Sequence, residues 1–125
     1  MPNSGITIPE NVLVVEDNTI IAIGLEEMIK DFGVAEVRTA GSVSQALALF
    51  DERRPDFAVL DVDLGSETSF AIAERLADAG VPFVFATGYG EKTNYPVRFA
   101  AADKLLKPYS PEALHAALAN ARKIS

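Results

Sequence analysis

The chain has 125 residues, 49% of them hydrophobic, with a formal net charge of −7 and no cysteine. This composition excludes a disordered chain, disulfides and thiolate metal sites, and it argues against non-specific binding to nucleic acid. The sequence shows no secretory signal, and no apolar run approaches the roughly 20 residues of a membrane helix. We therefore expect a cytoplasmic protein without membrane contact: a flexible lead-in over residues 1–10 and one domain over residues 11–124.

Short β-branched runs alternate with amphipathic helical patterns along the chain. The first helix is predicted to begin at Asn18 or Thr19 and to end at Gly33, and residues 91–101 show only a weak helical pattern, which Pro96 interrupts. The apolar face predicted for the first helix consists of Ile21, Leu25, Met28, Ile29 and Phe32. The predicted elements in chain order are strand 12–15, helix 19–32, strand 35–40, helix 43–54, strand 57–60, helix 67–79, strand 81–88, strand 103–108 and a helix from Pro111.

This alternation predicts an α/β fold, with a parallel five-stranded sheet, right-handed crossovers and helices on both faces. In such doubly wound sheets, ligands bind at the carboxyl ends of the strands, near the point where the strand order reverses. Side chains that follow the strands are therefore the first candidates for a site.

Acidic side chains follow the first and third strands. Glu16 and Asp17 come after the first strand, and Asp61 and Asp63 come after the third. Acids gathered at one site repel one another unless a cation lies among them. Their oxygens are hard ligands, so Mg²⁺, or Mn²⁺ in its place, is the expected metal.

Two further polar residues close the fourth and fifth strands. Thr87 and Lys107 reach the same edge of the predicted sheet, where a hydroxyl and an ammonium suit phosphate oxygens. Asp61, at the end of the central apolar strand, is then the best-placed carboxylate nucleophile for phosphoryl transfer.

These residues resemble the receiver domains of two-component response regulators, the CheY-like family, over about residues 10–123. The matching segments are "VVEDN", "VLDVDLG", "FATG" and "KP". The resemblance implies a flavodoxin-like (βα)5 fold with strand order 2-1-3-4-5. It implies Asp61 as phosphoacceptor, Asp17 as a direct metal ligand, Glu16 as a ligand through water and Asp63 as a ligand through its backbone carbonyl. Thr87 becomes the switch hydroxyl, and Lys107, followed by Pro108, the conserved lysine.

The segment "FATGYG", residues 85–90, also resembles a subgroup of stand-alone receivers, FATGUY, named for a Phe-Ala-Thr-Gly-x-Tyr pattern, although Tyr89 here follows Gly88 directly. Gly88 leaves the site open to an incoming donor. Many receivers carry an aromatic switch residue three positions before the conserved lysine, and this chain has Lys104 there. We hypothesise that Tyr89 or Lys104 takes over that role.

The resemblance implies a single-domain response regulator that is no enzyme beyond its own phosphorylation and dephosphorylation. Its partners would be a sensor histidine kinase or phosphotransfer protein, and an unidentified protein target on the face that receivers build from their fourth helix, fifth strand and fifth helix (the α4–β5–α5 face in receiver numbering), the last of which corresponds here to the helix from Pro111. Two alternatives remain open: a receiver-like interaction module that is never phosphorylated, and a metal-dependent phosphoester enzyme with an aspartyl nucleophile.

Overall fold

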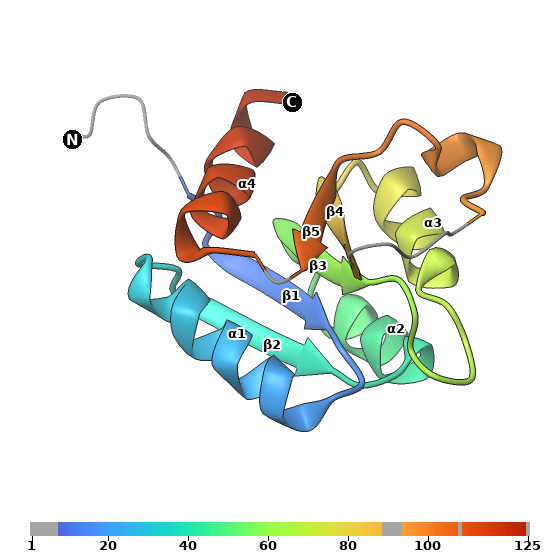
Figure 1. The fold of residues 1–125 in the computed structure, drawn as a ribbon, viewed down its shortest axis with the longest axis horizontal. Coiled ribbons are helices and arrows are strands. Elements are labelled where there is room, and N and C mark those ends of the chain that lie inside the picture. The colour runs from blue at the N-terminus through green and yellow to red at the C-terminus, as the bar shows by residue number, and fades with distance from the viewer. Residues whose placement is uncertain (1–7, 89–93, 108, 125) are drawn as a thin grey trace.

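The computed structural model describes residues 8–88, 94–107 and 109–124, with side chains described up to residue 119. Five parallel strands form one sheet in the order β2-β1-β3-β4-β5, which confirms the predicted topology (Figure 1). The strands are β1 (Asn11–Val15), β2 (Glu36–Ala40), β3 (Phe57–Asp61), β4 (Phe83–Gly88) and β5 (Lys104–Lys107). The helices are α1 (Thr19–Asp31), α2 (Val43–Glu52), α3 (Phe70–Asp78) and α4 (Pro111–Ile124), with a 3-10 helix η1 (Val97–Phe99).

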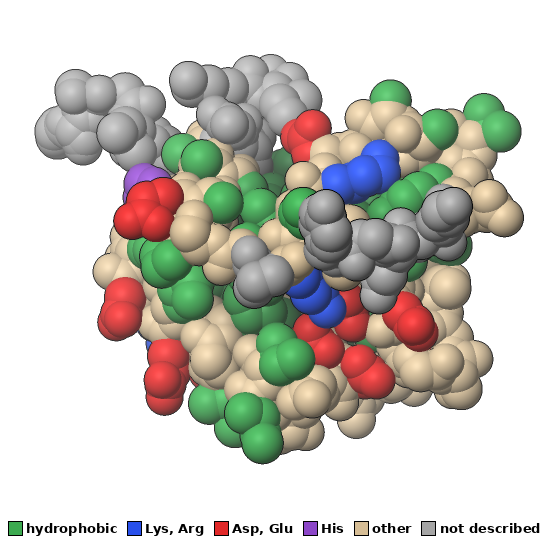
Figure 2. Space-filling model, viewed as in Figure 1, with side chains coloured by type: hydrophobic (Ala, Val, Ile, Leu, Met, Phe, Trp, Pro, Cys, Tyr) green, Lys and Arg blue, Asp and Glu red, His purple; other side chains and the backbone are tan. Residues whose placement is uncertain are grey.

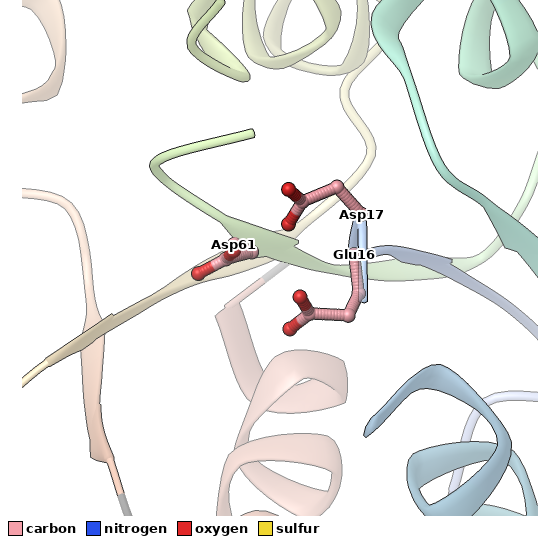
Figure 3. Close-up of side chains that lie close together, drawn as sticks. All are labelled: Glu16, Asp17 and Asp61. Atoms are coloured by element: carbon pink, nitrogen blue, oxygen red, sulfur yellow. The ribbon is translucent and has the colours of Figure 1, made fainter. Parts of the chain in front are cut away.

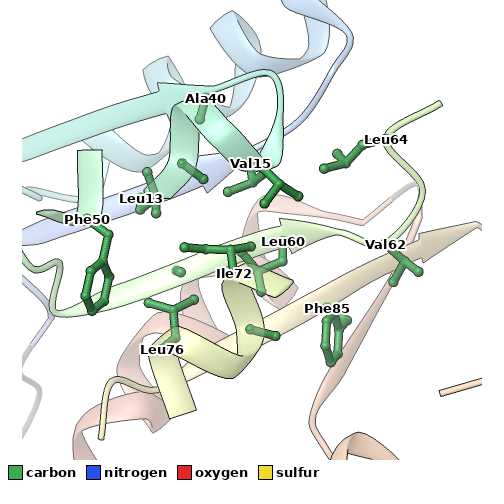
Figure 4. Packing of buried hydrophobic residues seen from close by; sticks show 14 of the residues in the cluster. Leu13, Val15, Ala40, Phe50, Leu60, Val62, Leu64, Ile72, Leu76 and Phe85 are labelled. Atoms are coloured by element: carbon green, nitrogen blue, oxygen red, sulfur yellow. The ribbon is translucent and has the colours of Figure 1, made fainter. Parts of the chain in front are cut away.

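Helices cover both faces of the sheet, as predicted. Apolar side chains of α2 and α3 pack on one face, where Leu13, Leu60 and Phe85 lie in the buried cluster of Figure 4. Side chains of α1 and α4, including Leu25 and Leu114, pack on the other. Because the central strands are buried on both faces, β1 and β3 contain the consecutive apolar runs Val12–Val15 and Phe57–Leu60 rather than an alternating pattern.

Three sequence predictions differ from the structure. Helix α3 begins at Phe70 and not at residue 67, because Thr68 pairs with Asp63 in an antiparallel bridge. Ile21 is 43% exposed and not part of the core. In the described residues 94–103, the connection to β5 holds the 3-10 helix η1 instead of an α-helix. The α1 and α2 caps at Asn18 and Ser42 agree with expectation.

The strand register aligns the carboxyl ends of the central strands. Val15 pairs with Leu60, Asp61 with Ala86, and Gly88 with Lys107. The residues that follow these strands therefore meet at one edge of the sheet. No helix among the described residues is both long enough and apolar enough to cross a membrane.

Candidate phosphoacceptor site

Three carboxylates converge at the carboxyl edge of the sheet. Glu16 and Asp17 follow β1, and Asp61 ends β3; one carboxylate oxygen of each lies within 4.8 Å of the others. Figure 3 shows the three side chains extending into a common space. Glu16 and Asp61 are buried, whereas Asp17 is exposed. We call Glu16, Asp17 and Asp61 the acid cluster, which the sequence prediction brought together correctly.

Lys107 places a cation beside two members of the acid cluster. Its Nζ donates a hydrogen bond to Asp61 Oδ1 at 2.6 Å and lies 3.7 Å from Glu16 Oε1. Figure 2 shows a basic side chain amid acidic ones on this face. The ammonium offsets part of the repulsion between carboxylates that burial would otherwise strengthen.

Glu16 has a pKa that this arrangement shifts. Burial raises its pKa above the ordinary value of 4.5, and the charge of Asp61 adds to that effect. The backbone N–H of Asn18, which donates to Glu16 Oε2 at 3.1 Å, and the charge of Lys107 lower the pKa in part. The net upward direction means that the folded protein retains the Glu16 proton to a higher pH than the unfolded chain does.

We expect Glu16→Gln to stabilise the metal-free protein at neutral pH. Well below pH 4.5, Glu16 is protonated in both the folded and the unfolded state. As the pH rises through its raised folded-state pKa, the native protein loses stability because it must bury a charge. Glutamine keeps the oxygen that accepts from Asn18 and carries no charge. Urea unfolding in EDTA should therefore show a gain that grows from pH 4 to pH 8; a gain independent of pH would contradict this assignment.

Asp63 lies in a compact loop that packs against the acid cluster. Residues 62–69 form a hairpin closed by the bridge between Asp63 and Thr68. The Asp63 side chain accepts a hydrogen bond from the Gly65 N–H at 2.9 Å and thereby stabilises the turn. Gly65 has φ +87°, and a Cβ there would lie 3.4 Å from Asp17 Oδ2. The 62–69 hairpin therefore carries the Asp63 backbone alongside the cluster.

The β4 end brings Thr87 and Gly88 to the same edge. Both are partly exposed, and in the β4–β5 ladder they pair with Leu106 and Lys107. Tyr89 and Pro108, which the sequence analysis also singled out, lie outside the described residues.

Lys104, which the resemblance places where many receivers have an aromatic switch residue, makes its own set of contacts. Its Nζ donates to the backbone carbonyls of Ala100 and Ala102, at 3.1 and 2.7 Å, and lies 4.5 Å from the centre of the Tyr95 ring. It therefore fastens the connection before β5 to the start of that strand, away from the acid cluster.

Tyr109 is a neighbour of the site that sequence reasoning missed. Burial raises the pKa of its phenol, and the negative charges of Glu16 and Asp61 raise it further. The side chain packs partly buried against the α1 and α4 side of the core. Its place two residues after Lys107 was the available signal, since the chain leaving β5 must pass this edge.

Comparison with known proteins agrees with this geometry. The model of the response regulator receiver domain family matches residues 12–119. The sensory transduction protein LytT of Bacillus subtilis (strain 168) is 31% identical over 117 residues, which are 91% of this chain and 48% of LytT. The chain thus spans about half the length of the curated relatives it matches.

Solved structures with the same fold include two that are similar over nearly their whole length. SdrG from Sphingomonas melonis Fr1 is 37% identical, with a TM-score of 0.75 over 94% of this chain and 97% of SdrG. The receiver domain of NtrX from Brucella abortus is 28% identical, with a TM-score of 0.79 over 91% of this chain and 99% of that domain. On the family match, the strand order and the acid cluster at the strand ends, the chain belongs to the response regulator receiver domain family of two-component signalling.

Proposed function

We propose that this receiver accepts a phosphoryl group on Asp61 from a sensor histidine kinase or phosphotransfer protein. The observation that carries the proposal is the environment of Asp61. Its carboxylate is buried at the end of a strand and accepts a hydrogen bond from Lys107 at 2.6 Å. Carboxylate oxygens of Glu16 and Asp17 lie within 4.8 Å of it. A carboxylate that only closes a strand needs no such neighbours, and their mutual repulsion costs stability.

The reaction needs one bond to form and one to break. A carboxylate oxygen of Asp61 attacks the phosphorus of a phosphohistidine, the P–N bond breaks, and the leaving imidazole takes up a proton from solvent. Lys107 and the Thr87 hydroxyl then bind the phosphoryl oxygens. Their positions, and the positive charge of Lys107, accelerate the transfer. Hydrolysis of the acyl phosphate by water later returns Asp61 to its free form.

The donor set of the acid cluster fits Mg²⁺ or Mn²⁺. Its ligand atoms are carboxylate oxygens within 4.8 Å of one another, and small hard cations bind through few such groups. Asp17 and Asp61 would hold the metal directly, Glu16 through water, and Asp63 through its backbone carbonyl. The bound cation supplies positive charge against the negative phosphoryl oxygens.

Two exposed apolar surfaces support protein partners. Ile20 and Ile23, 81% and 50% exposed, lie on α1 directly after the acid cluster, where a phosphoryl donor must approach; Figure 2 shows hydrophobic side chains exposed on this face. Leu106 on β5 and Val97 in η1 are 51% and 95% exposed. We assign the target protein to the face that η1, β5 and α4 form. We propose that the phosphoryl transfer and the binding of the target protein take place in the cytoplasm and that the receiver domain spans residues 11–124.

The proposal is tested by incubating the protein with acetyl phosphate and Mg²⁺ and recording its intact mass. We expect a single phosphoryl adduct that disappears in EDTA and in Asp61→Asn. Asp63→Asn is the matched control, because it removes an acid two residues away yet keeps the oxygen that binds the Gly65 N–H. It should retain the adduct.

A phosphorylated histidine kinase provides the second donor. If neither donor modifies Asp61, the phosphoryl-acceptor role is wrong and the unphosphorylated interaction module takes its place. Turnover of a phosphoester by the pure protein would instead favour the enzyme alternative.

A further inference from the structure

The 62–69 hairpin is held together by its own hydrogen bonds. The Leu64 N–H donates to the Glu67 carbonyl at 2.8 Å, and the Ser69 N–H donates to the Val62 carbonyl at 3.1 Å. Together with the Asp63–Thr68 bridge, these bonds make the hairpin a small rigid unit. A change in the position of Glu67 is therefore expected to change the position of Asp63 as well.

Glu67 connects this unit to a helix that is distant in the sequence. Its Oε2 accepts a hydrogen bond from the backbone N–H of Val43, the first residue of α2, at 2.9 Å. In Figure 1 the loop after β3 runs past α2 before it reaches α3. The two residues are 24 positions apart, so this contact fixes tertiary structure and not a local turn.

The amino-terminal end of α2 is a favourable place for a carboxylate. The first turn of α2 contains no acidic residue. The Ser42 hydroxyl accepts from the Gln45 N–H, and Gln45 Oε1 accepts from the Gly41 N–H. Glu67 supplies the Val43 N–H with an acceptor and places a negative charge at the positive end of the helix.

We propose that Glu67 is a positioning residue for the metal site. It fastens the 62–69 hairpin to α2 and thereby sets where the Asp63 backbone carbonyl lies beside Glu16, Asp17 and Asp61. This inference rests on the proposed function, in which that carbonyl binds the metal. Glu67 itself does not touch the metal, so its contribution is one of geometry.

The test measures Mn²⁺ binding directly, by the electron paramagnetic resonance signal of the free ion. Glu67→Ala should weaken Mn²⁺ binding by about tenfold, the low end of the effect that loss of a group orienting a metal ligand typically has. Glu67→Gln keeps the oxygen that accepts from Val43 and should bind within about twofold of the wild type. Melting temperatures in EDTA establish that each variant is folded at the temperature of the titration.

Glu52→Ala is the matched control for charge. Glu52 is an exposed acid at the other end of α2, and its loss changes the net charge equally. The inference is overturned if Glu67→Ala binds Mn²⁺ like the wild type, if Glu67→Gln is as weak as Glu67→Ala, or if Glu52→Ala loses as much. Failure of the wild type itself to bind Mn²⁺ would instead overturn the proposed function on which the inference rests.

Discussion

Lys107→Met is expected to slow phosphorylation of Asp61 by acetyl phosphate about a hundredfold, the effect typical of removing one preorganised charge from a reaction centre. The ammonium lies 2.6 Å from Asp61 Oδ1, and methionine keeps most of the side chain without the charge. The same change should lower the free energy of unfolding of the metal-free protein at pH 7 by about 2 kcal/mol, between the values of exposed and buried ion pairs. Intact mass against time and urea unfolding in EDTA measure the two effects.

The loss of stability should shrink as the pH falls. Without Lys107, the pKa of Glu16 rises further, since the lysine charge is one of the causes that lower it. A protonated Glu16 no longer repels Asp61, so little is lost in acid. Lys104→Met is the matched control, a lysine three residues earlier whose ammonium contacts Tyr95 and two backbone carbonyls. Equal phosphorylation rates for Lys107→Met and the wild type would show that Lys107 takes no part in the reaction.

The strands and the acid cluster were predictable from the sequence because one geometric rule covers both. Parallel strands end at a common edge, so residues that follow apolar runs must meet there. The register bears this out, with Asp61 beside Ala86 and Gly88 beside Lys107. The chemical roles assigned to these residues remain predictions.

The start of α3 was not predictable, because a bridge within the preceding loop and a hydrogen bond to a distant helix decide it. Ser-Glu-Thr-Ser before an apolar run is typical of a helix start. Thr68 instead pairs with Asp63, and Glu67 binds the N–H of Val43, so the helix begins three residues later. Local propensity carries no information on a partner 24 residues away.

Ile21 shows a second limit of pattern reasoning. Helical periodicity places it on the apolar face with Leu25 and Ile29, but it lies in the first turn of α1 and is 43% exposed, whereas the other two are buried. Ile20 and Ile23, on either side of it, are also exposed. Periodicity identifies the apolar face of a helix and cannot tell how much of that face the rest of the fold covers.

Lys104 stands where many receivers have an aromatic residue, and only the structure shows which groups it contacts instead. The sequence marks it as the wrong residue type for an aromatic switch. Its contacts with Tyr95 and with the carbonyls of Ala100 and Ala102 depend on the path of the irregular connection before β5. That path follows from packing of Tyr95 and Phe99 against Phe85, which no local pattern encodes.

Phe85→Ala is expected to cost about 4 kcal/mol of unfolding free energy, the usual range for emptying a large buried aromatic site. Phe85 is fully buried on β4, and its ring contacts those of Phe70, Phe83, Tyr95 and Phe99 at centroid distances of 5.3 to 5.7 Å. These rings join α3, β4 and the connection that carries η1. Because a domain of this size has a total stability of roughly 5–15 kcal/mol, the alanine variant should lose between about a quarter and most of that stability.

Two companion variants make this prediction measurable even if the alanine protein does not fold. Phe85→Leu fills most of the volume and should cost about 1 to 2 kcal/mol, chiefly for the lost ring contacts. Phe83→Ala, on the same strand but partly exposed, should cost less than Phe85→Ala because its site is not fully enclosed. Urea unfolding gives all three values. If Phe83→Ala proved as damaging as Phe85→Ala, the full enclosure of the Phe85 ring would not be what sets the cost, and Phe85 would not be the central residue of the aromatic cluster.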